Sequence, residues 1–356
     1  MENANQEINI CWLRRDLRLE DNVALYHALQ NDFPVLLVFI FDTDILNQLP
    51  YKVDKRVAFI HQNLEKINAV LKEYHSSIYI FNDTPHTAFE KLCNQFSVKA
   101  VFANHDYEPY AISRDLNIQK LLAGKDIPFH TYKDQVIFEK SEVMKPDGKP
   151  YTIFTPYSKV WKKKFADEKM KSFSTQSYFF NFYKKQDFHF PTLNEIGFKK
   201  VLLEIPVLDI NEQSIRNYGE RRDRPSFDGT SHASVHLRFG TISIRKLATL
   251  AGEWSEVWLN ELIWREFFMM ILFHFPFVVH RSFKEKYEHI QWRNNELEFE
   301  LWCKGETGFP IVDAGMRQLN ETGFMHNRVR MIVAGFLCKH LLIDWRWGEA
   351  YFSEKL

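Results

Sequence analysis

Two patterns predict an α/β fold, with a Rossmann-like parallel sheet near the amino end and an all-helical domain near the carboxyl end. From Ile8 to about Tyr132, short apolar runs alternate with amphipathic stretches, as in parallel strands joined by crossover helices. From about Pro206 onward, apolar residues recur at helical spacing. The sequence therefore predicts domains at 1–133 and 206–356, joined by a linker at 134–205.

The first domain can be divided into elements by its periodicity. The expected strands are 8–13, 35–41, 77–81, 100–103 and 128–132, and the expected helices between them are 55–74, 87–96 and 110–122. Such sheets bind ligands at the carboxyl ends of their strands, where WLRRDLRLEDN and NHDYEPY lie. No GxGxxG follows the first strand, so a dinucleotide is not expected there.

The linker is expected to wrap over the surface, because its periodicity is weak and KPDGKP, KKKF and QSYFFNFYKKQDFHF are polar or mixed. The 46 Lys and Arg residues balance the 46 Asp and Glu residues, so a nucleic-acid site is expected only as a local patch. The four cysteines lack paired spacing, which favours buried thiols in a reducing compartment and argues against structural zinc. No leader or membrane-spanning run is present, which predicts a cytoplasmic protein.

The run WLNELIWREFFMMILF at 258–273 predicts a buried helix, because it is apolar around nearly its whole circumference. Glu261 and Arg265 are the exceptions, and Trp264 flanks them. Their spacing suits a simple ion pair. Buried polar groups must find partners, however, so a polar cavity for a flat, hydrogen-bonding ligand is the second interpretation.

The densest cluster of polar and aromatic residues lies between Gly305 and Phe352. A helix is expected to begin at Pro310 and to end within 320–323. A second helix should follow, with one apolar face formed by Val329, Ile332, Val333, Phe336, Leu337 and Leu341. Asn327 is expected to cap it. Arg328 and Arg330 in its first turn oppose the helix dipole unless an anion or a base compensates, which indicates a ligand.

The segment GTSHASVHLRFG predicts a further helix with Thr230, Ser231 and Ser234 in its first turn. Hydroxyls and free N–H groups at a helix start suit a phosphate group. Simple capping is the alternative explanation.

Five segments together resemble the photolyase and cryptochrome family of flavoproteins, specifically its class I cyclobutane pyrimidine dimer photolyases. They are WLRRDLRLEDN, GTSHASVHLRFGTIS, WLNELIWREFF, TGFMHNRVRM and DWRWGEAYF. The resemblance runs from Ile8 to Phe352. It implies FAD as cofactor, ultraviolet-damaged DNA as partner, a monomer, and light-driven electron transfer to a flipped-out dimer.

The resemblance also assigns roles to individual residues. Those expected to bind FAD are Tyr218, Thr230, Ser231, His232, Ala233, Ser234, Trp258, Arg265 and Asn327. Ala233 replaces a leucine that many relatives have. Trp264 would stack on the dimer, and Glu261 would hydrogen-bond its bases. Met331 would pack against it, although a core position suits Met331 equally well.

Further roles concern DNA, electron transfer and light harvesting. Arg222 and Arg328 would contact phosphates, and Arg330 and Asn327 would lie at the same DNA surface. Trp292 and Trp345 would be the outer members of an electron relay, unless they are simply core aromatics. A second chromophore, methenyltetrahydrofolate or a deazaflavin, would contact Asn104, Asp106 and Glu108, for which solvated acids at a strand end are the alternative.

The resemblance requires the helix carrying Glu261 and the turn at Asn327 to meet at one cavity. The chain as given ends at Leu356, before the Asp-rich turn, the asparagine and the innermost relay tryptophan of relatives, which predicts weak or absent FAD binding. The alternative functions are a blue-light receptor of the cryptochrome type and a cofactor-free fragment that binds damaged DNA. A photolyase for the other major ultraviolet lesion is disfavoured, because MHNRVRM is not histidine-rich.

Overall fold

The computed structural model describes residues 6–168, 170–201 and 208–356. Its amino-terminal part contains a five-stranded sheet in the order β3-β2-β1-β4-β5, in which every pairing is parallel. The strands are β1 (Glu7–Leu13), β2 (Val35–Asp42), β3 (Tyr79–Asp83), β4 (Ser97–Asn104) and β5 (Phe129–Tyr132). All five expected strands are confirmed, with ends that differ by at most three residues.

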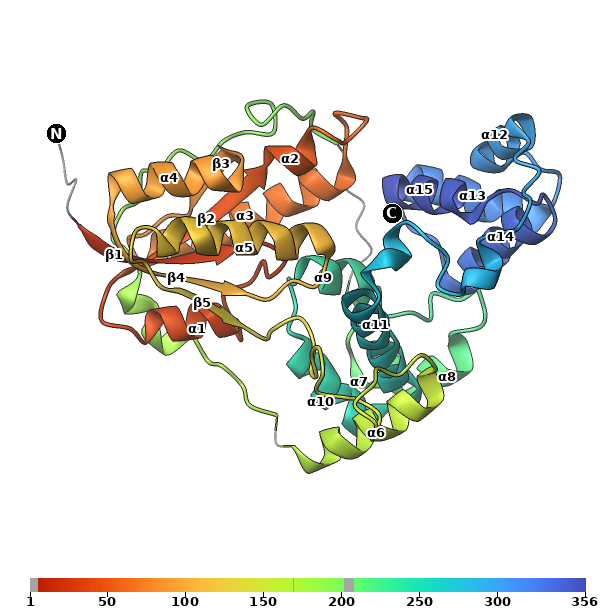
Figure 1. The fold of residues 1–356 in the computed structure, drawn as a ribbon, viewed down its shortest axis with the longest axis horizontal. Helices are drawn as coiled ribbons and strands as arrows, with labels where there is room; N and C mark the ends of the chain where they lie inside the picture. The colour runs from red at the N-terminus through yellow and green to blue at the C-terminus, as the bar shows by residue number, and fades with distance from the viewer. Residues whose placement is uncertain (1–5, 169, 202–207) are drawn as a thin grey trace. The chain divides into compact units, whose positions relative to one another are not determined.

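Five helices accompany this sheet (Figure 1): α1 (Val23–Leu29), α2 (Thr43–Leu46), α3 (Lys55–Glu73), α4 (Pro85–Gln95) and α5 (Pro109–Ala123). Alternate strand residues face opposite layers. Ile10 and Trp12 pack with α4 and α5, while Cys11 and Leu13 pack with α1 and α3. The three long helices confirm the prediction. The short helices α1 and α2 were missed, because seven and four residues give too few turns for a periodic signal.

The linker is partly buried, which corrects the expectation of a surface wrap. It contains α6 (Phe154–Asp167) and the 3-10 helix η1 (Gln176–Asn181). Tyr157 and Trp161 of α6 are each 1% exposed. The helix packs on α11 (Glu256–His274). The later part of the linker lies against the sheet, where Phe182 forms a parallel bridge with Val35.

The rest of the described chain is helical, as the sequence predicts. The elements are α7 (Glu212–Arg216), α8 (Tyr218–Arg221), α9 (Ala233–Phe239), α10 (Ile244–Trp254), α11, η2 (Pro276–Val279), η3 (Glu285–Tyr287), α12 (Glu296–Lys304), α13 (Pro310–Thr322), α14 (Asn327–Lys339) and α15 (Trp345–Lys355). Within the described ranges, no helix is both long enough and apolar enough to cross a bilayer.

The chain forms two compact units. The first comprises 1–215 and 231–279, and the second comprises 216–230 and 280–356. Helices α9 to α11, which the sequence places in the helical domain, therefore belong to the same unit as the sheet.

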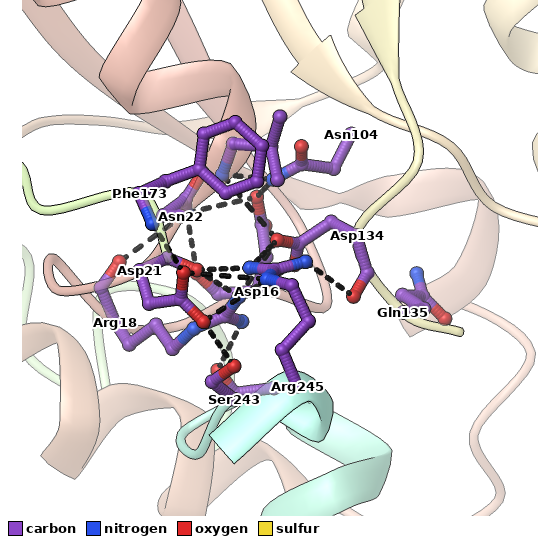
Figure 2. Close-up of polar contacts among 12 residues, drawn as sticks. Asp16, Arg18, Asp21, Asn22, Asn104, Asp134, Gln135, Phe173, Ser243 and Arg245 are labelled. Carbon is purple, nitrogen blue, oxygen red and sulfur yellow. Dashed lines mark hydrogen bonds and ion pairs between the residues drawn. The ribbon is translucent and has the colours of Figure 1, made fainter. Parts of the chain in front are cut away.

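A buried network of charges explains this grouping (Figure 2). Arg245 of α10 donates from Nη2 to Asp134 Oδ1 at 2.9 Å, and its Nε lies 3.1 Å from Asp21 Oδ2. Arg18 Nη2 lies 2.7 Å from the same Asp134 oxygen. Burial disfavours the charge on Asp134, but Arg18 and Arg245 outweigh it and lower the pKa of this carboxyl. Removing either arginine would leave a buried negative charge, so the network fixes α10 to the sheet.

The second unit has its own core around α12, α13 and α14. Val329, Val333, Phe336 and Leu337 of α14 are buried against Trp302 and α13. Ile332 is 37% exposed, so one member of the expected apolar face does not belong to the core. A Cβ added at Gly315 of α13 would lie 2.5 Å from Val329 Cγ1, which shows how closely the two helices approach.

Candidate functional site

Helix α11 is only partly buried, which corrects the prediction of burial all round. Phe268 is 60% exposed, whereas Leu262, Ile263 and Phe267 are buried. Glu261 and Trp264 are half-buried on this helix. The Trp264 indole stacks on the Phe154 ring of α6 at a centroid distance of 3.5 Å and an angle of 6°. Phe154 therefore covers one face of the indole.

Arg265 is a half-buried cation, and its two hydrogen bonds go to neutral partners. Its Nη1 donates to the Gln135 carbonyl at 2.7 Å, and its Nη2 donates to the Leu237 carbonyl at 3.2 Å. Burial, followed by the nearby charge of Arg15, lowers the pKa of Arg265 to about 10. A guanidinium held this way suits an added anionic group.

Glu266 is the charged residue of α11 that sequence reasoning missed. It is 3% exposed. Its Oε2 accepts from the Ile137 backbone N–H at 2.7 Å. Its Oε1 accepts from the Phe138 N–H at 3.1 Å, from the Trp161 indole Nε1–H at 2.5 Å and from the Tyr157 hydroxyl at 3.3 Å.

Burial raises the pKa of the Glu266 carboxyl to about 7, even though the hydrogen bonds from Trp161, Ile137 and Phe138 and the charge of Arg265 favour the ionised form. Since Glu266 is next to Arg265, the two side chains tie α11 to the loop at 134–138. In the sequence, Glu266 is one of three charged residues in the apolar run 258–273, and helical periodicity does not show which of the three has the most buried side chain.

The start of α9 differs from the prediction. The helix begins at Ala233, so Thr230 and Ser231 precede it, and only Ser234 lies in its first turn. Its N-cap is His232, which has φ 51° and makes no side-chain cap hydrogen bond, so capping does not explain the hydroxyls.

The structure does bring two predicted cofactor residues of the first unit together. Trp258 of α11 is 2% exposed. Its indole Nε1–H donates to the Ser231 hydroxyl at 3.3 Å. The segment before α9 is therefore held against α11 by residues that the family resemblance assigned to FAD.

In the second unit, the predicted phosphate contacts lie around one carboxylate. Arg328 donates from Nη2 and Nε to Asp223 Oδ1 at 2.5 and 3.2 Å. Arg222 Nε lies 3.7 Å from the same oxygen, and its guanidinium lies 5.5 Å from the centroid of the Tyr218 ring. Met331 is 57% exposed, with its sulfur 3.4 Å from Arg328 Nη1, so it is not a core residue.

The first turn of α14 corrects the predicted cap. The N-cap is His326, whose Nδ1 accepts from the Arg328 N–H at 3.1 Å. Asn327 is the first helical residue and is exposed. Arg330 is half-buried and donates to the Met325 carbonyl at 3.3 Å. Burial lowers the pKa of the Arg330 guanidinium.

The two predicted relay tryptophans also belong to the second unit. Trp292 and Trp345 are both half-buried. Trp345 begins α15, and the Arg346 guanidinium lies 4.8 Å from the centroid of its ring. Neither indole is fully enclosed, in contrast to the core residue Trp302.

The predicted antenna contacts are engaged within the first unit. Asn104 is buried, and its Nδ2 donates to Asp16 at 2.6 Å and to Asn22 at 2.8 Å. Arg15 lies 3.1 Å from an oxygen of Asp106 and 2.7 Å from one of Glu108. All three side chains therefore have partners within the protein, so the alternative of solvated acids at a strand end does not describe Asp106 and Glu108.

Comparisons with known proteins agree with this architecture. The family model described as DNA photolyase matches residues 9–174, and the model described as FAD binding domain of DNA photolyase matches residues 258–356. A deoxyribodipyrimidine photo-lyase from Alkalihalophilus pseudofirmus is 34% identical, covering 99% of this chain and 77% of the relative. The corresponding protein from Escherichia coli is 32% identical, covering 98% and 78%.

Two solved structures extend the comparison. An archaeal photolyase from Sulfolobus tokodaii, described as containing two FAD molecules, has 34% identity and a TM-score of 0.81, covering 99% of this chain and 79% of that one. A cryptochrome from Synechocystis has a TM-score of 0.84 but 24% identity, covering 100% and 80%, and supports the fold alone.

A parallel-sheet domain followed by a helical FAD-binding domain defines the photolyase and cryptochrome class of flavoproteins. Within that class, the chain belongs to the DNA photolyase family. The residues present fit the flavin cofactor, because Arg265 is a half-buried cation that donates to two neutral backbone carbonyls, and the same helix carries Trp258, which donates to Ser231.

Proposed function

We propose that this protein repairs cyclobutane pyrimidine dimers in ultraviolet-damaged DNA with blue light. The observation that carries the proposal is the presentation of Trp264 on α11, with one indole face against Phe154 and with Glu261 one helical turn away. In a chain whose relatives are deoxyribodipyrimidine photo-lyases, this arrangement suits stacking on a flipped-out pyrimidine pair.

On the first unit, Trp264 would stack on the dimer, and the Glu261 carboxyl would hydrogen-bond the edges of its bases. Arg265 would hold an anionic part of FAD, and Ser231 with Trp258 would shape the adjoining wall of the site. Reduced flavin, when bound and excited by light, supplies the electron that opens the cyclobutane ring. The protein itself positions the lesion and provides the electrostatic environment.

On the second unit, Arg222 and Arg328 would contact phosphates beside the lesion, and Met331 would pack against the dimer. Tyr218, Thr230 and Asn327 would contact the cofactor. Trp292 and Trp345 would pass electrons inward to reduce the flavin.

Further parts of the proposal concern the state of the protein. Ultraviolet-damaged duplex DNA is its expected partner, and a monomeric, cytoplasmic protein is the expected form. A second chromophore would bind near Asp106 and Glu108 only if the ion pairs with Arg15 open, because those pairs occupy the carboxylates.

Repair of an oligonucleotide with a single thymine dimer, under blue light and with a reductant and added FAD, tests the proposal. The wild-type chain should restore the two thymines, and Trp264→Ala should lower the rate about 5- to 150-fold by removing a stacking contact of ~1–3 kcal/mol. Phe180→Ala, which removes a 70% exposed aromatic ring from the linker, is the control and should leave repair unchanged. Absence of light-dependent repair by the FAD-loaded wild-type chain would refute the proposal.

A further inference from the structure

The carboxylate of Asp223 lies where two predicted phosphate-binding arginines meet. Arg328 contacts its Oδ1 through Nη2 at 2.5 Å and through Nε at 3.2 Å, and Arg222 Nε lies 3.7 Å from the same atom. We propose that Asp223 is a built-in competitor for a DNA phosphate, which occupies Arg328 in the free protein and lowers its affinity for DNA. The inference rests on the proposed function, because it takes these arginines as phosphate contacts.

The chemistry of the contact favours this interpretation. A guanidinium that directs two N–H groups at one oxygen anion can bind a phosphate oxygen as well as a carboxylate oxygen. The Asp223 oxygen therefore has the charge and the hydrogen-bond partners that a phosphate oxygen would have. Arg328 has a further contact to the sulfur of Met331, at 3.4 Å.

The position of Arg328 in α14 provides a separate reason for an anion. Arg328 is the second residue of this helix of 13 residues, where the helix dipole disfavours a cation. Asp223 compensates that charge from a position 105 residues away in the sequence. The conflict that indicated a ligand in the sequence is thus resolved in the free protein by an internal carboxylate.

The pair is exposed enough to exchange. The side chains of Arg328 and Asp223 are 36% and 58% exposed. Hydrogen bonding from Arg328 lowers the pKa of Asp223, so the carboxylate stays ionised at neutral pH. An exposed ion pair of this kind shifts an equilibrium by less than about fivefold. A DNA phosphate, supported by the rest of the DNA surface, can therefore displace it.

Removing the carboxylate charge tests the competition directly. Asp223→Asn should bind a fluorescein-labelled duplex about two- to fivefold more tightly than the wild-type chain in the dark, with or without a thymine dimer. The measurement is fluorescence anisotropy at low salt, repeated at higher salt, where screening should reduce the difference. In an Arg328→Ala background, Asp223→Asn should raise the affinity less than in the wild-type background, because the main competed cation is absent and Arg222, 3.7 Å from the same oxygen, remains.

Glu300→Gln is the matched control. Glu300 lies on α12 of the same unit, 3.5 Å from Lys304, and its loss changes the net charge by the same amount. An equal increase in affinity from this variant would overturn the inference, since net charge alone would explain it. An unchanged or weakened affinity of Asp223→Asn, or an increase that is equally large with Arg328→Ala, would also overturn it. If the wild-type chain binds no duplex at all, the proposed DNA binding is itself wrong. If it binds and Asp223→Asn has no effect, only the proposed competition by Asp223 is wrong.

Discussion

Glu266 should make the stability of the first unit depend on pH near neutrality. The perturbation is Glu266→Gln, which keeps the shape of the side chain but cannot ionise. Burial raises the pKa of the folded carboxyl to about 7 from an ordinary value of 4.5. An unfolded chain therefore releases this proton at a lower pH than the folded chain. The contribution of Glu266 to the free energy of unfolding is complete below the unfolded pKa of 4.5 and is lost as pH rises through about 7.

The size of the effect follows from the two pKa values. The difference between about 7 and 4.5 corresponds to about 3 kcal/mol in full. Most of it should appear between about pH 5 and about pH 8. Other groups, such as Asp134 with its lowered pKa, contribute in the opposite direction at acid pH. The comparison with Glu266→Gln isolates the Glu266 contribution because those groups are common to both proteins.

Urea denaturation followed by tryptophan fluorescence, at several pH values in this range, measures the difference. Relative to the wild-type chain, Glu266→Gln should become more stable by about 2 to 3 kcal/mol as pH rises. Parallel stability curves for the two proteins would refute the reasoning. Glu300→Gln, an exposed glutamate variant, should follow the wild-type curve.

Two further substitutions test how the first unit is held together. Arg245→Met should lower the free energy of unfolding by about 3 to 5 kcal/mol, because it leaves the buried Asp21 and Asp134 carboxylates short of a cation; a urea midpoint equal to that of the wild type would contradict this. Gly240→Ala should lower the free energy of unfolding by about 1 to 3 kcal/mol, because Gly240 has φ +64° and an added Cβ would clash with the backbone of Arg15. Thermal unfolding measures this second effect, and an unchanged midpoint would show that the turn can relax.

Much of the fold is predictable because local periodicity determines it. The five parallel strands and the three long helices of the sheet domain were expected within a few residues of their observed ends. Helix α13 begins at Pro310 and ends before Gly323, which has φ +74°. Each of these patterns involves residues only a few positions apart, so it can be recognised in the sequence without the tertiary structure.

The candidate site was predictable in part. Trp258 and Ser231, which family resemblance placed at the cofactor, are in contact through a hydrogen bond. Asn327 is not the cap of α14, because a histidine one residue earlier takes that position. The first residue of a helix depends on which side chain accepts a hydrogen bond from a free N–H group of the first turn. Several neighbouring polar residues could do so here, so the predicted start can be wrong by one to three residues.

The sequence by itself determined the alternating α/β order, the helical carboxyl part and the residue types available for a flavin and a DNA phosphate. Only the tertiary structure decided which charges meet. Arg245 reaches Asp134 across 111 positions, Glu266 reaches Ile137 across 129, and Arg328 reaches Asp223 across 105. These pairings depend on burial and on the cost of leaving a charge without a partner, which act through space and have no period along the chain.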